Sequence, residues 1–162
     1  MLLKGSFTIK ARREAIWEFM VDPMAVGGCA PGVGGIEIIV PNQKFQAKVA
    51  AGFGGTLATF KTEVEFLELS PPTSAKFRAH GVAPNGAVDA TSEMTLVERG
   101  ENETEVQWTA DVIVVGVLAS LASRLMEVIT RRLTYEFFAC MQNKLNSEAK
   151  KSPESKLSAA ES

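Results

Sequence analysis

The chain has 162 residues, of which 46% are hydrophobic and 22% charged, and its formal net charge is -2. This length suits one well-buried core and is too short for two ordinary domains. The near-neutral charge gives no general reason to expect nucleic-acid binding. The most apolar run, residues 112–122, has about half of the roughly 20 residues that a membrane-spanning helix needs. Since the first residues also lack an apolar signal core, we expect a soluble, cytoplasmic protein.

The N-terminal part predicts one strand followed by two short helices. Apolar and polar residues alternate over residues 3–10, which is the period of a strand with one buried face. Residues 11–21 have helical spacing, with Ile16 and Phe19 facing inward. Asp22 and Pro23 are a suitable N-cap and first residue for a second short helix, which we expect to end at Gly27-Gly28.

From residue 36 onward the apolar period changes to two and stays there until residue 114. Turn residues such as Pro84-Asn85-Gly86 separate the segments, so consecutive strands are expected to pair antiparallel. Each strand has one polar face, which predicts a sheet with one side toward water. The six predicted strands cover residues 36–40, 45–53, 58–66, 75–80, 88–96 and 105–114.

The only long helical pattern lies at residues 117–145, where apolar residues recur at steps of three and four. No other element is long enough to cover the inner face of the sheet. We therefore predict an α+β fold in which a seven-stranded antiparallel sheet curves around this helix, with two short helices between the first two strands. Residues 147–162 are small and polar, so we expect a domain at 1–146 and a disordered tail at 147–162.

The predicted inner face is rich in alanine, and its only polar side chains are Thr62 and Ser92. Such a face fits either a solid core or an apolar ligand cavity. It offers no acid, base or set of metal ligands, so we expect no metal and no cofactor there. The expected cavity residues are Phe45, Phe60, Thr62, Phe77, Ala90, Ser92, Met94, Trp108, Ala110, Leu118, Leu121, Leu125 and Ile129.

Cys29, Pro31 and Gly32 lie in a turn flanked by glycines, which we interpret as a mobile loop at the cavity entrance. Cys29 and Cys140 are far apart and form no disulfide framework or metal motif. We therefore interpret them as small buried hydrophobes in a reducing compartment, with a reactive Cys29 as the alternative. His80 falls in the outward register and is expected to be a solvated surface histidine.

Several motifs together resemble the CoxG family of carbon monoxide dehydrogenase subunits, within the START-like (SRPBCC) superfamily that includes polyketide cyclases. The motifs are Gly5-Ser6-Phe7, Ile16-Trp17, Asp22-Pro23, Cys29-Ala30-Pro31-Gly32, Val115-Gly116 before Leu118–Leu125, and Phe137-Phe138. The resemblance implies a helix-grip fold over residues 1–146 with an internal hydrophobic cavity. It also implies an accessory role beside a molybdenum-containing carbon monoxide dehydrogenase, in membrane recruitment or delivery of a lipophilic quinone.

Three functions remain open at this point. The leading hypothesis is a non-enzymatic carrier of a quinone or lipid-like molecule, with peripheral attachment at the inner membrane face. The second is an enzyme of the cyclase or hydrolase type, for which Glu18, Asp22 and Cys29 are the available acid, base or nucleophile near the entrance. The third is a protein-binding accessory subunit for maturation or membrane recruitment, whose cavity is incidental.

Overall fold

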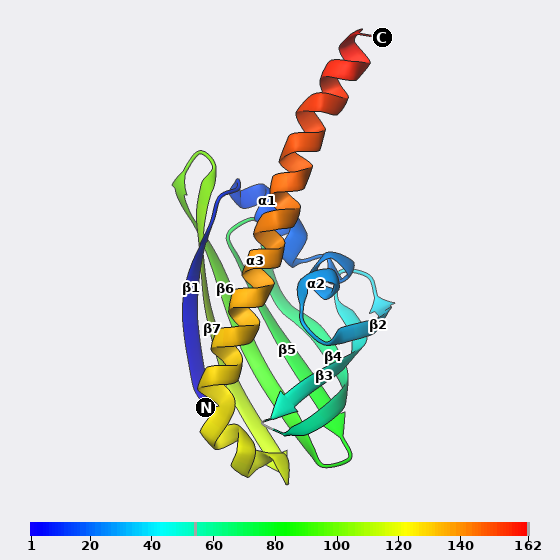
Figure 1. The fold of residues 1–162 in the computed structure, drawn as a ribbon, viewed down its shortest axis with the longest axis vertical. Helices are drawn as coiled ribbons and strands as arrows, with labels where there is room; N and C mark the ends of the chain where they lie inside the picture. Colours follow the sequence, from blue (N-terminus) through cyan, green and yellow to red (C-terminus); the bar gives the residue numbers. More distant parts are fainter. Residues whose placement is uncertain (54, 162) are drawn as a thin grey trace.

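The computed structural model describes residues 1–53 and 55–161, with the side chains of all of these except Phe53 and residues 148–161. Seven strands and three helices are present in the described residues (Figure 1). Their bounds are β1 Leu2–Ile9, α1 Arg13–Met20, α2 Pro23–Cys29, β2 Val33–Val40, β3 Lys44–Phe53, β4 Thr56–Ser70, β5 Ser74–Ala83, β6 Gly86–Gly100, β7 Glu103–Gly116 and α3 Leu118–Glu161.

The strands form one antiparallel sheet in the order β1-β7-β6-β5-β4-β3-β2, which confirms the predicted α+β architecture. Strands β2 to β7 pair with their neighbours in the chain, and β1 returns to pair with β7 along the other edge. The sheet curves around α3, which crosses its inner face, while α1 and α2 lie at one end of that face (Figure 1). The two longest strands, β4 and β6, have 15 residues each and exceed the predicted segments, because their polar ends remain paired with neighbouring strands.

The layer between the sheet and α3 has two hydrophobic clusters. The first, which we call the three-helix end, joins α1, α2 and residues 137–145 of α3 to the sheet. Its members include Ile9, Ile16, Leu96, Val106 and Met141, all at most 1% exposed. The second, which we call the alanine end, lies under the first turns of α3. It consists of Ala58, Phe60, Ala83, Leu118, Ala122 and Met126.

Helix α3 is longer than the sequence pattern predicts. We expected it to end at Leu145 and a disordered tail to follow, but it continues to Glu161 and projects beyond the sheet (Figure 1); residue 162 lies outside the described residues. Glutamate, alanine, lysine and leucine in this extension are good helix formers, and adding a turn to an existing helix needs no new nucleation, whereas Pro153 opposes the helix because it lacks a backbone N–H. Among the described residues, no helix is both long and apolar enough to span a bilayer.

Candidate functional site

Helix α2 lies over the inner face of the sheet and covers a small apolar pocket of about 80 Å³. The pocket lies between Met20 of α1, Pro23 and Val26 of α2, and apolar side chains of β3 to β6. Phe66 is the centre of its aromatic wall, with ring centroids 6.3 Å from Phe45 and 6.4 Å from Phe77. A wall without charged groups favours a hydrophobic occupant.

The N-terminal end of α2 is fixed by the cap that the sequence predicts. The Asp22 side chain accepts a hydrogen bond of 3.0 Å from the Met24 backbone N–H, and Pro23 occupies the first helical position. An N-cap of this kind satisfies a backbone donor that the first turn of a helix leaves unpaired. The cap therefore helps to hold Pro23 against the pocket.

The C-terminal end of α2 is fixed by a disulfide between Cys29 and Cys140 of α3, whose Cα atoms lie 5.5 Å apart. Our expectation of two unpaired thiols is therefore wrong. The sequence separation of 111 conceals the pairing in the sequence, whereas the fold brings the end of α2 against α3. The expectation of a reducing compartment rested on unpaired cysteines and loses its basis with this finding.

The loop after α2, in which we predicted a mobile entrance from Cys29, Pro31 and Gly32, is hydrogen-bonded to β3. The Ala50 N–H donates a hydrogen bond of 2.8 Å to the Gly32 carbonyl. Gly32 has a φ of +77°, and a β-carbon there would lie 2.1 Å from the Ala50 carbonyl oxygen. Only glycine fits this approach, so the loop fixes the position of α2 relative to the sheet edge.

The expected cavity residues separate into several groups. Phe45, Phe77 and Met94 line the pocket under α2, and Trp108 lines a groove beside β1 that is described below. Two of the others, Phe60 and Leu118, are buried at the alanine end. The remaining residues are partly buried in the middle of the layer or at the alanine end: Thr62, Ala90, Ser92, Ala110, Leu121, Leu125 and Ile129.

The two polar side chains of the inner face are both bonded to backbone carbonyls. The Ser92 hydroxyl donates to the Thr109 carbonyl at 2.8 Å, and the Thr62 hydroxyl donates to the Phe60 carbonyl at 3.4 Å. Their donors are therefore already used within the sheet. The middle of the inner face consequently presents a largely apolar surface to α3.

Of the candidate acid, base and nucleophile near the entrance, two side chains are engaged in structural contacts and the third faces solvent. Cys29 has no thiol while it is bonded to Cys140. Asp22 is occupied as the cap of α2, and Glu18 is exposed on α1. Within the described residues, no group of three or more histidine, cysteine, aspartate or glutamate side chains could hold a metal ion.

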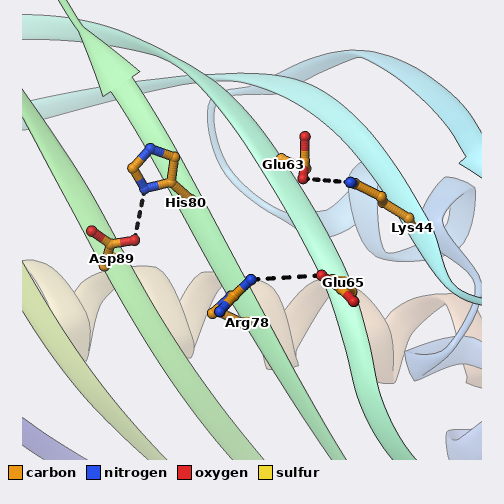
Figure 2. Close-up of polar contacts among 6 residues, drawn as sticks. All are labelled: Lys44, Glu63, Glu65, Arg78, His80 and Asp89. Carbon is orange, nitrogen blue, oxygen red and sulfur yellow. Dashed lines mark hydrogen bonds and ion pairs between the residues drawn. The ribbon is translucent and has the colours of Figure 1, made fainter.

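The outward face of β3 to β6 has a network of charged side chains on the side away from α3 (Figure 2). The Lys44 ammonium lies 2.8 Å from the Glu63 carboxylate, and Nδ1 of His80 lies 2.6 Å from the Asp89 carboxylate. The hydrogen bond from Lys44 lowers the pKa of Glu63, and the same bond raises the pKa of Lys44. All of these side chains are partly exposed to solvent, and His80 faces outward as predicted.

A larger hollow of about 580 Å³ lies between β1 and the facing side of α3. Six consecutive residues, Leu2 to Phe7, form one wall, and α3 residues between Glu127 and Phe138 form the other. The Trp108 indole lies against Gly5, where a β-carbon would be 2.8 Å from Trp108 Cζ2. We call this hollow the β1 groove.

A curved seven-stranded sheet around a long C-terminal helix, with two short helices after β1, defines the START-like helix-grip class. Solved structures with this fold include a conserved protein from Geobacillus kaustophilus, with 22% identity, a TM-score of 0.84 and coverage of 91% of this chain and 96% of that one. The ZhuI aromatase/cyclase from Streptomyces sp. R1128 has 14% identity, a TM-score of 0.71 and coverage of 92% and 95%. A START superfamily protein from Mycobacterium smegmatis has 14% identity, a TM-score of 0.61 and coverage of 90% and 97%.

The chain belongs to the CoxG family of carbon monoxide dehydrogenase subunits, whose model matches residues 5–146. This confirms the resemblance found in the sequence. No curated protein matches the chain. The family and the fold suggest hydrophobic ligand binding or an accessory role, and the structural neighbours show the fold alone.

Proposed function

We propose that the chain is a non-enzymatic carrier of a hydrophobic small molecule of the quinone or lipid type. The observation that carries this proposal is the pocket under α2, whose nine lining residues are all apolar. Binding sites for small molecules are concave and mostly apolar, and a wall without charged groups selects against polar ligands. An accessory role beside a molybdenum-containing carbon monoxide dehydrogenase follows from the family and belongs to the same proposal.

The size of the pocket determines how a ligand enters. Its volume of about 80 Å³ is well below the roughly 300–1,000 Å³ of ordinary ligand sites. A quinone ring or a fatty-acyl chain therefore fits only if α2 moves away from Phe45 and Phe66. The Asp22 cap and the Cys29–Cys140 bond hold both ends of α2, so this movement has to bend the helix between them. Gly27 and Gly28, which are weak helix formers, make such bending easier.

Native mass spectrometry and organic extraction of the purified protein test this proposal, with decylubiquinone and oleic acid as added probes. Ala75 lines the pocket and is 3% exposed, so Ala75→Phe fills the pocket and is expected to abolish uptake. Ala50→Phe places the same ring on the outward face of β3 and is the matched control. Absence of uptake by the wild type, or equal uptake by Ala75→Phe, would overturn the proposal.

A cytoplasmic location with peripheral attachment at the inner membrane face remains a prediction of the sequence. The Cys29–Cys140 bond weighs against a strongly reducing compartment, because disulfides persist mainly in oxidising ones. Cell fractionation in the presence of a thiol-blocking reagent shows both where the protein is located and whether Cys29 and Cys140 are bonded in the cell. A membrane-bound or soluble pool with alkylated Cys29 and Cys140 would support a reducing location, and a non-alkylated disulfide would contradict it.

A further inference from the structure

Strand β1 is an edge of the sheet, and half of its backbone polar groups point away from the sheet. Its pairing with β7 runs from Leu2 to Ile9 without a register shift. Met1 and Val112 exchange backbone hydrogen bonds of 2.8 Å in both directions. Antiparallel pairs alternate between bonded and non-bonded, so Leu3, Gly5 and Phe7 bond to β7 in the same way. The N–H and C=O groups of Lys4 and Ser6 therefore point to the free side.

Helix α3 already uses this free side at one position. The Gln142 side chain accepts a hydrogen bond of 2.7 Å from the Lys10 N–H and donates one of 3.2 Å to the Lys10 carbonyl. Lys10 is an even number of residues from Lys4 and Ser6, so its backbone N–H and C=O point to the same side of the strand as theirs. The Gln142 amide thus takes the place that a neighbouring strand would take, and it closes the edge at this end.

Toward Leu2, the same edge is open and faces the β1 groove. The six consecutive residues that line this groove belong to both faces of β1, so the hollow lies against the edge of the strand and not against one face. The Thr134 hydroxyl, on the opposite wall, donates back to the Thr130 carbonyl at 2.7 Å and leaves the edge unbonded. An extended segment placed here would reach the free groups of Lys4 and Ser6.

The charged side chains of the groove determine which charge an extended segment must have to bind there. Lys4 on β1 and Arg131 on α3 both line it. Among the described residues, neither the Lys4 ammonium nor the Arg131 guanidinium has a hydrogen-bond or ion-pair partner. Glu127 is the one carboxylate in the lining. The two unpartnered cations give the groove a net positive charge, which favours carboxylate groups in the occupant.

The other edge of the sheet does not offer the same surface. Strand β2 has register shifts between Gly34 and Glu37 and between Ile38 and Val40. It also contacts α2. Bulges and covering helices are devices that keep an edge strand from pairing further. The regular, open edge is therefore the one formed by β1.

We propose that the β1 groove binds an extended, acidic peptide segment of a partner protein as an eighth strand beside β1. The segment pairs its backbone with Lys4 and Ser6. Because neighbouring strand residues point to opposite faces, one carboxylate reaches Arg131 on the α3 side and the next reaches Lys4 on the outer side. This surface is separate from the apolar pocket, so its occupancy does not depend on the ligand proposed above.

Fluorescence anisotropy with labelled hexapeptides tests the proposal. The probe is Thr-Val-Glu-Glu-Val-Thr, and the charge-reversed control is Thr-Val-Lys-Lys-Val-Thr. We expect saturable binding of the acidic peptide and no measurable binding of the basic one. N-methylation of the amides of the acidic peptide that face β1 removes its strand hydrogen bonds, leaves the protein unchanged, and is expected to abolish binding.

Hydrogen exchange of the backbone amides locates the peptide. In the free protein, the amides of Lys4 and Ser6 are expected to exchange fast, and those of Leu3, Gly5 and Phe7 slowly. The acidic peptide should slow exchange at Lys4 and Ser6 selectively. Protection elsewhere with no change at these two amides would overturn the proposal.

Matched variants test the charge and the backbone donor. Arg131→Glu is expected to weaken binding at least about fivefold, since an attractive surface contact becomes repulsive. Arg124→Glu is the control, because Arg124 is exposed on the same helix and does not line the groove. Ser6→Pro removes a donor on the free side without removing a bond to β7, and it should abolish binding with the thermal midpoint measured in parallel.

Three further results would overturn the proposal. The first is acidic-peptide binding that Arg131→Glu leaves unchanged. The second is displacement of the peptide by decylubiquinone, which would make the groove a lipid site. The third is a dimer in solution that Ser6→Pro dissociates, which would assign this edge to a second copy of the chain.

Discussion

The two ends of the layer between the sheet and α3 are built from different contacts. At the three-helix end, large side chains such as Ile16 and Phe138 pack between the elements, and α2 covers a pocket. At the alanine end, the small side chains of Ala58, Ala83 and Ala122 belong to one buried cluster, and α3 begins with a hydrogen bond of 3.3 Å from the Leu118 N–H to the Asn85 carbonyl. One end is therefore packed with small side chains beside the start of α3, whereas the other contains an apolar pocket of about 80 Å³.

The largest expected effect lies in the core of the three-helix end. Ile16 is 0% exposed, so Ile16→Ala removes buried methyl groups and leaves a cavity. We expect the free energy of unfolding to fall by about 2–5 kcal/mol. Ile16→Leu conserves volume and should cost less than about 1.5 kcal/mol. Urea unfolding measures both, and a loss below about 1 kcal/mol for Ile16→Ala would show that this end is loosely packed.

The next effect concerns the covalent link of the same end. Cys140→Ser removes the bond to Cys29, which closes a loop of sequence separation 111. We expect the oxidised protein to lose about 2–4 kcal/mol of unfolding free energy. In dithiothreitol, wild type and variant should unfold at the same denaturant concentration. If they also coincide without the reductant, the bond contributes nothing to the stability of the folded state.

Enlarging an alanine distinguishes the two ends directly. Ala122 is 2% exposed in the close contact of the alanine end, so Ala122→Leu should overpack it and cost about 1–3 kcal/mol. Ala75 is similarly buried but lines the pocket, so Ala75→Leu should cost less than about 1 kcal/mol, because its side chain grows into empty space. Thermal or urea unfolding compares the two. Equal losses would mean that the ends do not differ in packing.

The smallest expected effect on stability lies on the outward face of the sheet, which is outside both ends of the layer under α3. The Lys44 hydrogen bond lowers the pKa of Glu63 from its ordinary value of 4.5. The resulting stabilisation is present above that value and is lost as the pH falls through the lowered pKa of the folded state. Glu63→Gln removes this contribution, so it should lower stability slightly at neutral pH and flatten the decline below pH 4.5. Thermal midpoints at several pH values check this, and an unchanged acid limb would contradict it.

The architecture could be predicted because apolar and polar residues alternate along each strand. Alternation along β4, for example, places Phe60 inward and Lys61 outward, and a single-residue slip would reverse both. The cap at Asp22 and the outward His80 follow from equally local rules. These features depend on neighbours within a few residues, so the sequence shows them directly.

The remaining features depend on which distant elements meet. Nothing near Cys29 indicates that α3 returns to it 111 residues later. The β1 groove likewise needs the pairing of β1 with β7 and the crossing of α3, which no local pattern specifies. The end of α3 differs from the sequence pattern for another reason: a polar composition indicates a lack of core contacts, but it does not by itself end a helix that has already begun.

The contact between Trp108 and Gly5 gives the molecule an intrinsic optical reporter. The chain has two tryptophans, and Trp17 is 8% exposed within the three-helix end, whereas Trp108 is less buried and lines the β1 groove. Emission from Trp17 should be blue-shifted and insensitive to added quencher. Emission from Trp108 should be quenched by acrylamide until the groove is filled. Trp108→Phe would leave a single-tryptophan protein, whose tryptophan emission follows the packing of the three-helix end alone.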